Sequence, residues 1–304
     1  MCSGRRNGLR SIRSDRRPAE QACGKRFPRN RPVRNGLHGT GLCETAFEDF
    51  MRIDKYLADM GAGTRGELRK SIRKNGVRIG GELVFDPGYL LKEDGASDVF
   101  PEVIYQGELW QYEPVVWYML NKPAGVLSAS EDRKQKTVLD LITERKRTDL
   151  FPVGRLDKDT EGLLLITNDG DTAHRLLAPK FHVDKTYLVR TAGSAFTGED
   201  AARFAAGIRY DEALTALPAR LEKSPFGDPM EALVTIREGK FHQIKKMVAA
   251  LGGGKEVTYL RRISFGPLKL DGALAPGEYR RLTPEEEAAL ADCCKGREHG
   301  RESR

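Results

Sequence analysis

The residues best suited to chemistry lie in one short loop, G-R-L-D-K-D-T-E-G at 154–162. Asp157, Asp159 and Glu161 supply carboxylates, with Arg155 before them and a lysine among them. Ionised carboxylates could serve as a nucleophile, as a glycosidase-type acid–base pair or as metal ligands. The alternation of acidic and basic side chains fits the last two roles weakly. The competing interpretation is a solvated surface loop, which is common for charged segments.

A buried strand is expected to hold one end of this loop. The run L-L-L-I-T at 163–167 is apolar and of strand length, and the turn N-D-G at 168–170 ends it. A loop that enters a rigid strand can keep a reactive side chain in a fixed position. The sequence therefore predicts that the strand positions the charged side chains of the loop.

Several other kinds of site find no support in the sequence. There is no phosphate-binding loop, dinucleotide fingerprint or Gly-x-Ser-x-Gly elbow. The histidines of the body, His174, His182 and His242, lack metal-ligand spacing, so we expect no metal. The five cysteines lie near the two ends of the chain, which predicts neither a disulfide framework nor a cysteine metal site. Together with the absence of an apparent signal or membrane helix, this predicts a protein of the reducing cytoplasm.

Most of the positive charge lies in the first 50 residues. They carry 11 Lys and Arg against 5 Asp and Glu, while the whole chain has a net charge of +7. Their Arg, Gly, Asn and Pro content predicts a disordered tail, and residues 293–304 are predicted to be a second one. The first tail could contact RNA phosphates, it could lack a function, or translation could begin at Met51.

Residues 51–112 are predicted to form a small unit of two helices and a hairpin. Ile53, Leu57 and Met60 share one helical face, and the capping box T-R-G-E then starts a second helix. The turns N-G and G-G frame a hairpin at 77–85.

The basic residues of this unit suggest a nucleic-acid partner. Residues 52–78 hold eight Lys and Arg against three Asp and Glu. A charge run is usually a solvated face, but its concentration on the second helix favours phosphate contacts. The stretch from R-I-D-K-Y-L-A to K-N-G-V-R-I-G-G resembles the S4-type RNA-binding domain, which commonly precedes RNA-modifying enzymes. The expected RNA-binding residues are Arg52, Arg65, Arg69, Lys70, Arg73, Lys74 and Arg78.

The remaining body, residues 113–292, is predicted to be a catalytic domain with more strands than helices. A linker is expected at 101–114 and a mobile polar loop at 128–136. Strands are predicted at 115–120, 163–167, 185–190, 231–237, 256–263 and 277–282. Helices are predicted at 138–144, 171–178, 198–206, within 238–251 and at 284–292. Short connections favour a mixed, largely antiparallel sheet, so the fold class is α+β.

Several motifs of this body resemble, in order and spacing, the RsuA type of pseudouridine synthase. They are L-N-K-P-A-G at 120–125, the loop and strand at 154–170, K-T-Y-L-V at 185–189, E-G-K-F-H-Q-I-K-K-M at 238–247 and L-A-P-G-E-Y-R-R-L-T near the end. The resemblance implies isomerisation of a uridine within RNA, in which the ribose bond moves from nitrogen 1 to carbon 5 of uracil without a cofactor. It outweighs the surface-loop interpretation.

The same resemblance implies a catalytic role for Asp157, Tyr187 and Lys245. Asp157 would attack the ribose or the base, or stabilise the cleaved intermediate. Tyr187 would stack on the uracil and help move the proton from carbon 5; the alternative is a buried strand tyrosine. Lys245 would pair with Asp157 and keep it ionised; the alternative is a helix-surface cation.

Three further residues are expected to contact RNA. Arg155 would help extrude the nucleotide or hold its phosphate, because the target base must leave the stack. Lys122 and His242 are predicted to bind RNA as supporting residues, and Asp159 to support the loop.

The expected partner is ribosomal RNA or an assembling ribosomal subunit, bound by a monomer with no membrane contact. The motifs resemble the small-subunit branch of the family more than the large-subunit branch, which implies 16S rRNA, at the uridine-516 type of site, as the substrate, with 23S rRNA as the alternative. Two alternatives remain: a non-catalytic ribosome-assembly factor on the same fold, and a hydrolase that uses the acidic loop.

Overall fold

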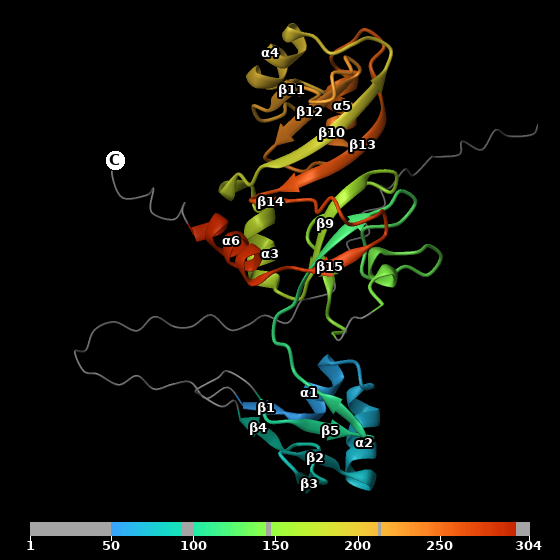
Figure 1. Ribbon diagram of the computed structural model, residues 1–304, viewed down its shortest axis with the longest axis vertical. Helices are drawn as coiled ribbons and strands as arrows, with labels where there is room; N and C mark the ends of the chain where they lie inside the picture. The colour runs from blue at the N-terminus through green and yellow to red at the C-terminus, as the bar shows by residue number, and fades with distance from the viewer. Residues whose placement is uncertain (1–49, 93–99, 144–146, 212–213, 296–304) are drawn as a thin grey trace, which may run out of the picture. The chain divides into compact units, whose positions relative to one another are not determined.

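The computed structural model describes residues 50–92, 100–143, 147–211 and 214–295 (Figure 1). The predictions for the tail at 1–50 lie outside these residues, except for Phe50. At the other end, the last helix runs to Lys295, three residues beyond its predicted end. Within the described residues no helix is long and apolar enough to span a membrane.

The N-terminal unit forms the predicted helices and hairpin. α1 (Ile53–Asp59) and α2 (Arg65–Asn75) are followed by the antiparallel strands β2 (Val77–Ile79) and β3 (Glu82–Val84). The expected apolar face of α1 is buried, and the side chains of Thr64 and Glu67 form the capping box of α2. A separate ribbon pairs β1 (Phe50–Arg52) with β4 (Leu90–Lys92).

The prediction of a linker at 101–114 is wrong. β5 (Val103–Tyr105) and β6 (Glu108–Trp110) form a hairpin that completes the four-stranded sheet β3-β2-β5-β6. Its turn residues Gln106 and Gly107 both have positive φ, +55° and +85°. Such turns usually carry Asn-Gly or Asp-Gly, so Gln-Gly gave a weak signal. The Tyr56 hydroxyl donates to the Trp110 carbonyl at 2.6 Å, which ties the hairpin to α1.

The second unit is built on a nine-stranded sheet with the path β11-β12-β10-β13-β9-β7-β15 (Figure 1). All its pairings are antiparallel except that between β9 and β13, which confirms the mixed, largely antiparallel α+β prediction. The strands along the path are β11 (Arg220–Lys223), β12 (Glu231–Ile236), β10 (Lys185–Ala192), β13 (Glu256–Phe265), β9 (Glu161–Thr167), β7 (Trp117–Lys122) and β15 (Tyr279–Arg281). β8 (Phe151–Pro152) pairs with β9, and β14 (Leu268–Lys269) with β13.

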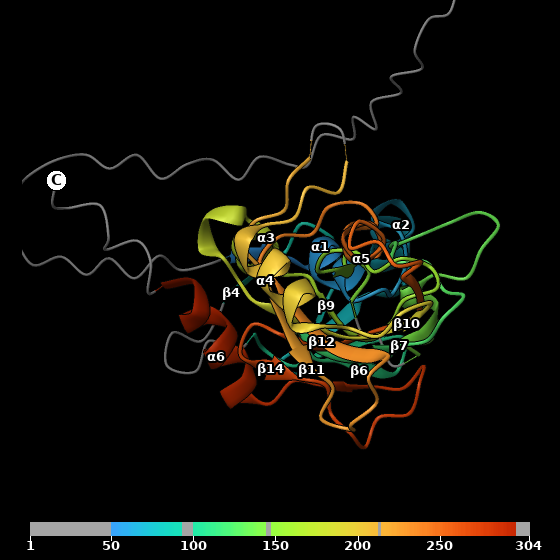
Figure 2. The same cartoon turned by 90° about the horizontal axis from the view of Figure 1, so that it is seen from above.

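Helices pack on this sheet, and the neighbouring strands β7 and β9 are almost completely buried. α3 (Gly170–Leu177) packs against α6 (Pro284–Lys295), and α4 (Gly198–Ala206) lies beside β11 (Figures 1 and 2). α5 (Gln243–Ala249) packs against β13. Leu163 and Leu165 enter the hydrophobic cluster of α3 and α6, whereas Leu164 enters a cluster on the other face. The helix predicted at 138–144 is a single 3₁₀ turn, Val138–Leu141.

Gly162 allows β9 to pair in parallel with β13 at the end of the acidic loop. It pairs with Arg262 on β13 and has φ +99°. A Cβ atom placed there would lie 2.2 Å from the Arg262 carbonyl oxygen, a distance that no side chain tolerates. The loop 154–160 therefore enters β9 at a point where only glycine fits.

Candidate active site

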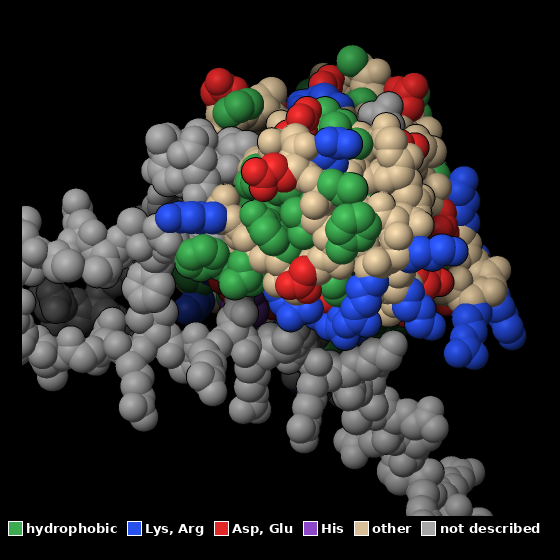
Figure 3. Space-filling view, turned by 90° about the horizontal axis from the view of Figure 1, so that it is seen from below, with side chains coloured by type: hydrophobic (Ala, Val, Ile, Leu, Met, Phe, Trp, Pro, Cys, Tyr) green, Lys and Arg blue, Asp and Glu red, His purple; other side chains and the backbone are tan. Residues whose placement is uncertain are grey.

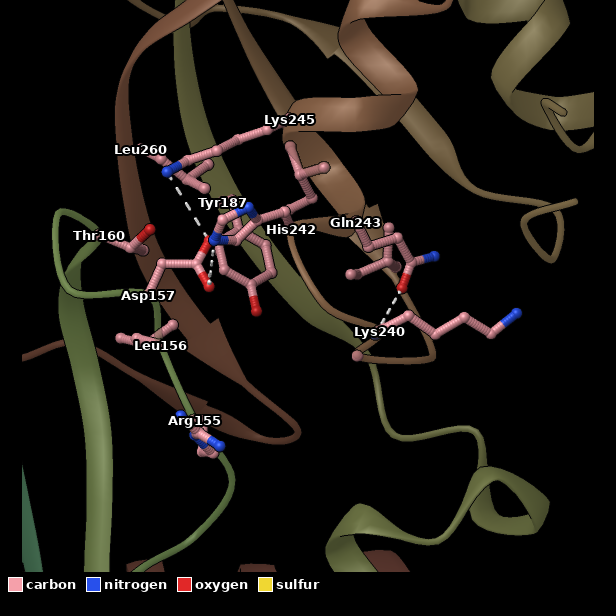
Figure 4. Close-up of a pocket in the computed structure, with 13 residues that line it drawn as sticks. Arg155, Leu156, Asp157, Thr160, Tyr187, Lys240, His242, Gln243, Lys245 and Leu260 are labelled. Atoms are coloured by element: carbon pink, nitrogen blue, oxygen red, sulfur yellow. Dashed lines mark hydrogen bonds and ion pairs between the residues drawn. The ribbon is translucent and has the colours of Figure 1, made fainter. Parts of the chain in front are cut away.

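One pocket of the second unit collects the predicted catalytic residues. Asp157, Tyr187 and Lys245 all line it, together with Arg155 and His242 (Figure 4). Its walls come from the loop before β9, from β10, and from the segment that leads into α5. Residues nearly 90 positions apart in sequence thus converge on one carboxylate.

Asp157 sits at the centre of this group and remains accessible. Its side chain is 25% exposed. The Lys245 Nζ lies 3.7 Å from its Oδ2, and the His242 Nε2 lies 3.7 Å from its Oδ1. Both contacts are longer than hydrogen bonds. The carboxylate therefore has a cation beside it while its oxygens stay free to approach a substrate.

Lys245 binds a different carboxylate more closely than predicted. Its ammonium donates to both oxygens of Asp159, at 2.6 and 2.7 Å. This hydrogen bonding lowers the pKa of Asp159 below its ordinary value. Lys245 thus lies beside Asp157, as predicted, and in addition forms shorter contacts with Asp159, so that the lysine bridges the two carboxylates.

Tyr187 presents its ring to the pocket from β10. The residue is only 6% exposed, and its ring packs into the core cluster beside Val189 and Leu260. The Arg262 guanidinium lies 6.0 Å from the ring centroid. Figure 4 shows the ring next to Asp157. Tyr187 is thus both a buried strand tyrosine and a pocket residue, so the two sequence interpretations were compatible.

Lys122 does not lie where an RNA-binding residue must lie, and that prediction is wrong. The side chain is fully buried at the end of β7. Its Nζ donates to the carbonyl oxygens of Asp157, Lys158 and Thr160, at 3.2, 3.2 and 2.8 Å, and to that of Pro123. Burial lowers the pKa of Lys122 to about 8. The residue instead fixes the backbone of the acidic loop from beneath.

Ser128 is a second anchor, which sequence reasoning missed. Its hydroxyl donates to the Leu156 carbonyl at 2.9 Å and accepts from the Leu156 backbone N–H at 3.1 Å. The Gly125 N–H also donates to the Lys158 carbonyl. The segment at 128–136, predicted to be mobile, is therefore tied at its start to the loop that carries Asp157. Nothing in a local sequence pattern marks a contact across 28 positions.

Arg155 and His242 occupy the rim of the pocket. Arg155 is exposed, and no hydrogen bond or ion pair of its side chain is described in the structure. His242 has a side chain 41% exposed and precedes α5. Both side chains are therefore accessible to a bound strand, as their predicted roles require.

The basic residues of the N-terminal unit fall into two sets. Arg52, Arg65 and Arg69 all donate to the fully buried carboxylate of Asp54, at 2.6–3.2 Å. These hydrogen bonds and charges overcome the effect of burial and hold the pKa of Asp54 well below its usual range. Asp54 was not predicted, because one acid in a basic stretch gives no signal of its own.

The residues of the second set are not bound to a buried carboxylate in the described part of the structure. Lys70, Arg73 and Lys74 are exposed on α2, and no ion pair is described for them. Arg78 is exposed on β2 and donates to the Gly81 carbonyl. Figure 3 shows Lys and Arg side chains along one edge of the face seen from below.

Comparison with known proteins decides the family. Residues 116–250 match the family model described as RNA pseudouridylate synthase, and residues 51–96 match the S4 domain. The RNA pseudouridine synthase YtzG of Bacillus subtilis, described as uncharacterized, is 47% identical over 78% of this chain and 96% of its own. Ribosomal small subunit pseudouridine synthase A of Escherichia coli is 39% identical over 79% of this chain and 100% of its own.

The chain belongs to the RsuA family of pseudouridine synthases. A crystal structure of a pseudouridylate synthase agrees, with 36% identity, a TM-score of 0.54, and coverage of 79% of this chain and 99% of that chain. This pseudouridine synthase is therefore an RNA isomerase with an N-terminal S4 domain. Among its described residues, no group of three or more His, Cys, Asp or Glu is arranged to hold a metal ion.

Proposed function

We propose that this pseudouridine synthase modifies 16S rRNA of the small ribosomal subunit, at the uridine-516 type of site. The observation that carries the proposal is the similarity, at 38–40% identity over 79% of this chain, to enzymes named ribosomal small subunit pseudouridine synthase A. The motif wording M-L-N-K-P and K-T-Y-L-V points the same way. The proposed partner is thus ribosomal RNA or an assembling small subunit, bound by a monomer.

The proposed chemistry begins at Asp157. The N1–C1′ bond of the uridine breaks, the C5–C1′ bond forms, the proton leaves C5, and N1 ends protonated, so the isomerisation balances without a cofactor. The ionised carboxylate acts on the ribose or the base while the uracil is detached. Among the described residues, no short hydrogen bond to its oxygens is present, which keeps them available.

The neighbours of Asp157 have supporting roles in this proposal. Lys245 places its positive charge 3.7 Å from the Asp157 carboxylate, and Asp159 restrains the long lysine side chain. Tyr187 lies against the base and is placed to assist proton movement from C5. Arg155 holds or replaces the extruded nucleotide from the rim, because a paired or stacked base cannot reach Asp157.

The choice of rRNA can be tested with purified components. The enzyme is incubated with protein-free 16S rRNA, 23S rRNA and small-subunit assembly intermediates, and pseudouridine is mapped in each. We expect one modified position, in 16S rRNA or in the intermediates that contain it. Modification confined to 23S rRNA would contradict the proposed substrate while leaving the enzyme class intact.

A change of the exposed cations of α2 is expected to weaken RNA binding without unfolding the S4 domain. In the triple variant Lys70→Gln, Arg73→Gln, Lys74→Gln, each lost phosphate contact should lower the slope of log affinity against log salt by roughly 0.7–0.9. The fold should persist because no ion pair of these side chains is described. Filter binding across a salt series measures the slope. An unchanged slope would show that α2 does not contact the backbone.

We further propose the domain boundaries 51–112 for the RNA-binding domain and 113–292 for the catalytic domain. Deletion of residues 51–112 is then expected to leave a catalytic domain that unfolds cooperatively but binds rRNA more weakly. Circular dichroism during thermal unfolding and filter binding test the two parts. A deletion variant without a cooperative transition would refute the division.

A further inference from the structure

Phe241 is an exposed aromatic residue beside the active site. It is 74% exposed, and its ring stacks on that of His242, with centroids 3.8 Å apart and planes inclined by 19°. His242 in turn holds Nε2 3.7 Å from the Asp157 carboxylate. We call Phe241 and His242 the Phe–His stack. The stack places the exposed ring of Phe241 next to His242, which itself neighbours Asp157.

The segment that carries the Phe–His stack is braced on both sides. The buried Gln243 accepts a hydrogen bond from the Lys240 N–H at 3.0 Å, and its Nε2 donates to Glu238. Glu238 also accepts from the Leu217 N–H at 2.9 Å. These bonds hold the backbone on either side of Phe241, so its exposed ring has a defined position.

His242 adds a sign of functional constraint. Its φ of +53° lies in the left-handed region, which is uncommon for residues other than glycine. Its side chain makes no capping hydrogen bond to α5, although it occupies the N-cap position. The unusual backbone therefore directs the imidazole toward Asp157 and Phe241 instead of serving the helix.

We propose that the Phe–His stack receives an RNA base directly adjacent to the target uridine. This rests on the proposed function, because flipping the uridine out of its stack deprives the neighbouring base of a partner. A planar aromatic face replaces that partner without regard to base identity. The pocket beside the stack is lined by the exposed cations Arg155 and Lys240, and the Lys240 ammonium lies 3.2 Å from Glu238. Exposed cations suit a phosphate backbone better than an apolar protein surface.

Substitutions at Phe241 separate stacking from mere apolar contact. We expect Phe241→Ala to raise KM for an rRNA fragment about 5- to 150-fold, the loss expected for one base–aromatic stack, with a smaller change in kcat. Phe241→Leu should resemble the alanine variant, since it keeps apolar area but lacks a ring, and Phe241→Trp should restore binding. Phe226→Ala is the matched control, because Phe226 is 76% exposed but, unlike Phe241, is neither adjacent in sequence to nor stacked on a residue that lines the pocket.

A second substrate locates the contact on the RNA. Two RNA fragments are prepared, one without the base on the 5′ side of the target uridine and one without the base on the 3′ side. For one of these two fragments, Phe241→Ala should raise KM only slightly. An equal cost on both abasic fragments, or wild-type KM for Phe241→Leu, would overturn the proposal. Wild-type enzyme and Asp157→Asn are assayed on the same RNA: active Asp157→Asn would instead reject the proposed function of the site.

Discussion

Replacing Asp157 by Asn is expected to reduce pseudouridine formation by about 10³-fold or more, the scale of losing a group that acts on the reacting atoms. Asparagine keeps the shape but has neither the charge nor the nucleophilicity of a carboxylate. The fold should be unaffected, because the ion pairs described for the Asp157 side chain, with Lys245 and His242, are both 3.7 Å long. We expect the free energy of unfolding to change by less than about 0.5 kcal/mol. Single-turnover assays with excess enzyme measure the chemical step directly.

Asp159→Asn is the matched control for this experiment. It makes the same chemical change two residues away, at a side chain that is 70% exposed and bonded to Lys245. An amide oxygen can still accept from Lys245, so we expect a loss of about tenfold at most. Equal losses in the two variants would show that the charge of the whole loop matters, and not a special role of Asp157.

Replacing Lys122 by Met is expected to damage both the loop and its activity. Methionine fills the space but leaves the carbonyl oxygens of Asp157, Lys158 and Thr160 without the ammonium. Buried acceptors without a hydrogen bond lower the free energy of unfolding, while removal of a buried charge partly offsets this loss. We expect a loss of about 2–4 kcal/mol in the free energy of unfolding and about 10²-fold in kcat, because Asp157 is no longer held in place. Urea unfolding and steady-state kinetics test the two effects.

Lys158→Met provides the comparison within the same loop. Lys158 is exposed, and its ammonium donates to the Gln135 side chain. Its loss should change stability by less than about 0.5 kcal/mol. Wild-type stability and kcat in Lys122→Met would show that the loop does not depend on its buried lysine.

The lowered pKa of Lys122 leads us to expect that, as the pH rises above about 8, kcat falls while the contribution of this group to stability increases. In the folded enzyme the ammonium loses its proton near pH 8, against 10.5 for an ordinary lysine. Between these values the unfolded chain binds more protons, so this group makes the protein more stable as pH rises. The neutral amine, however, donates one hydrogen bond fewer to the loop. We therefore expect a fall in kcat above about pH 8 that is not accompanied by unfolding and that is absent from Lys122→Met.

The sequence predicted most of the elements that have a local cause. The apolar period of α1 and the capping box of α2 depend on neighbouring residues, and both were recognised. The apolar run of β9 needed no distant partner to be identified as a strand. The β5–β6 hairpin was missed because its Gln-Gly turn lacks the usual residues, although its positive φ values serve the same geometry.

The sequence predicted which residues form the site but not which of them contact one another. Family resemblance placed Asp157, Tyr187 and Lys245 together, and the fold brings them to one pocket. Resemblance could not show that Lys245 binds Asp159 more closely, or that Lys122 is buried. These contacts of Lys245 and of Lys122 with the loop join residues 35 or more positions apart, and only the sheet determines which side chains meet.

The most direct test of the central claim is pseudouridine mapping in rRNA from cells that lack the gene. The strain is complemented with the wild-type gene, with Asp157→Asn, or with the empty vector, and every uridine of 16S and 23S rRNA is examined. Our account predicts that one pseudouridine in 16S rRNA disappears with the gene, returns with the wild type and stays absent with Asp157→Asn. Restoration of that pseudouridine by Asp157→Asn, or an unaltered 16S pattern in the deletion strain, would contradict it.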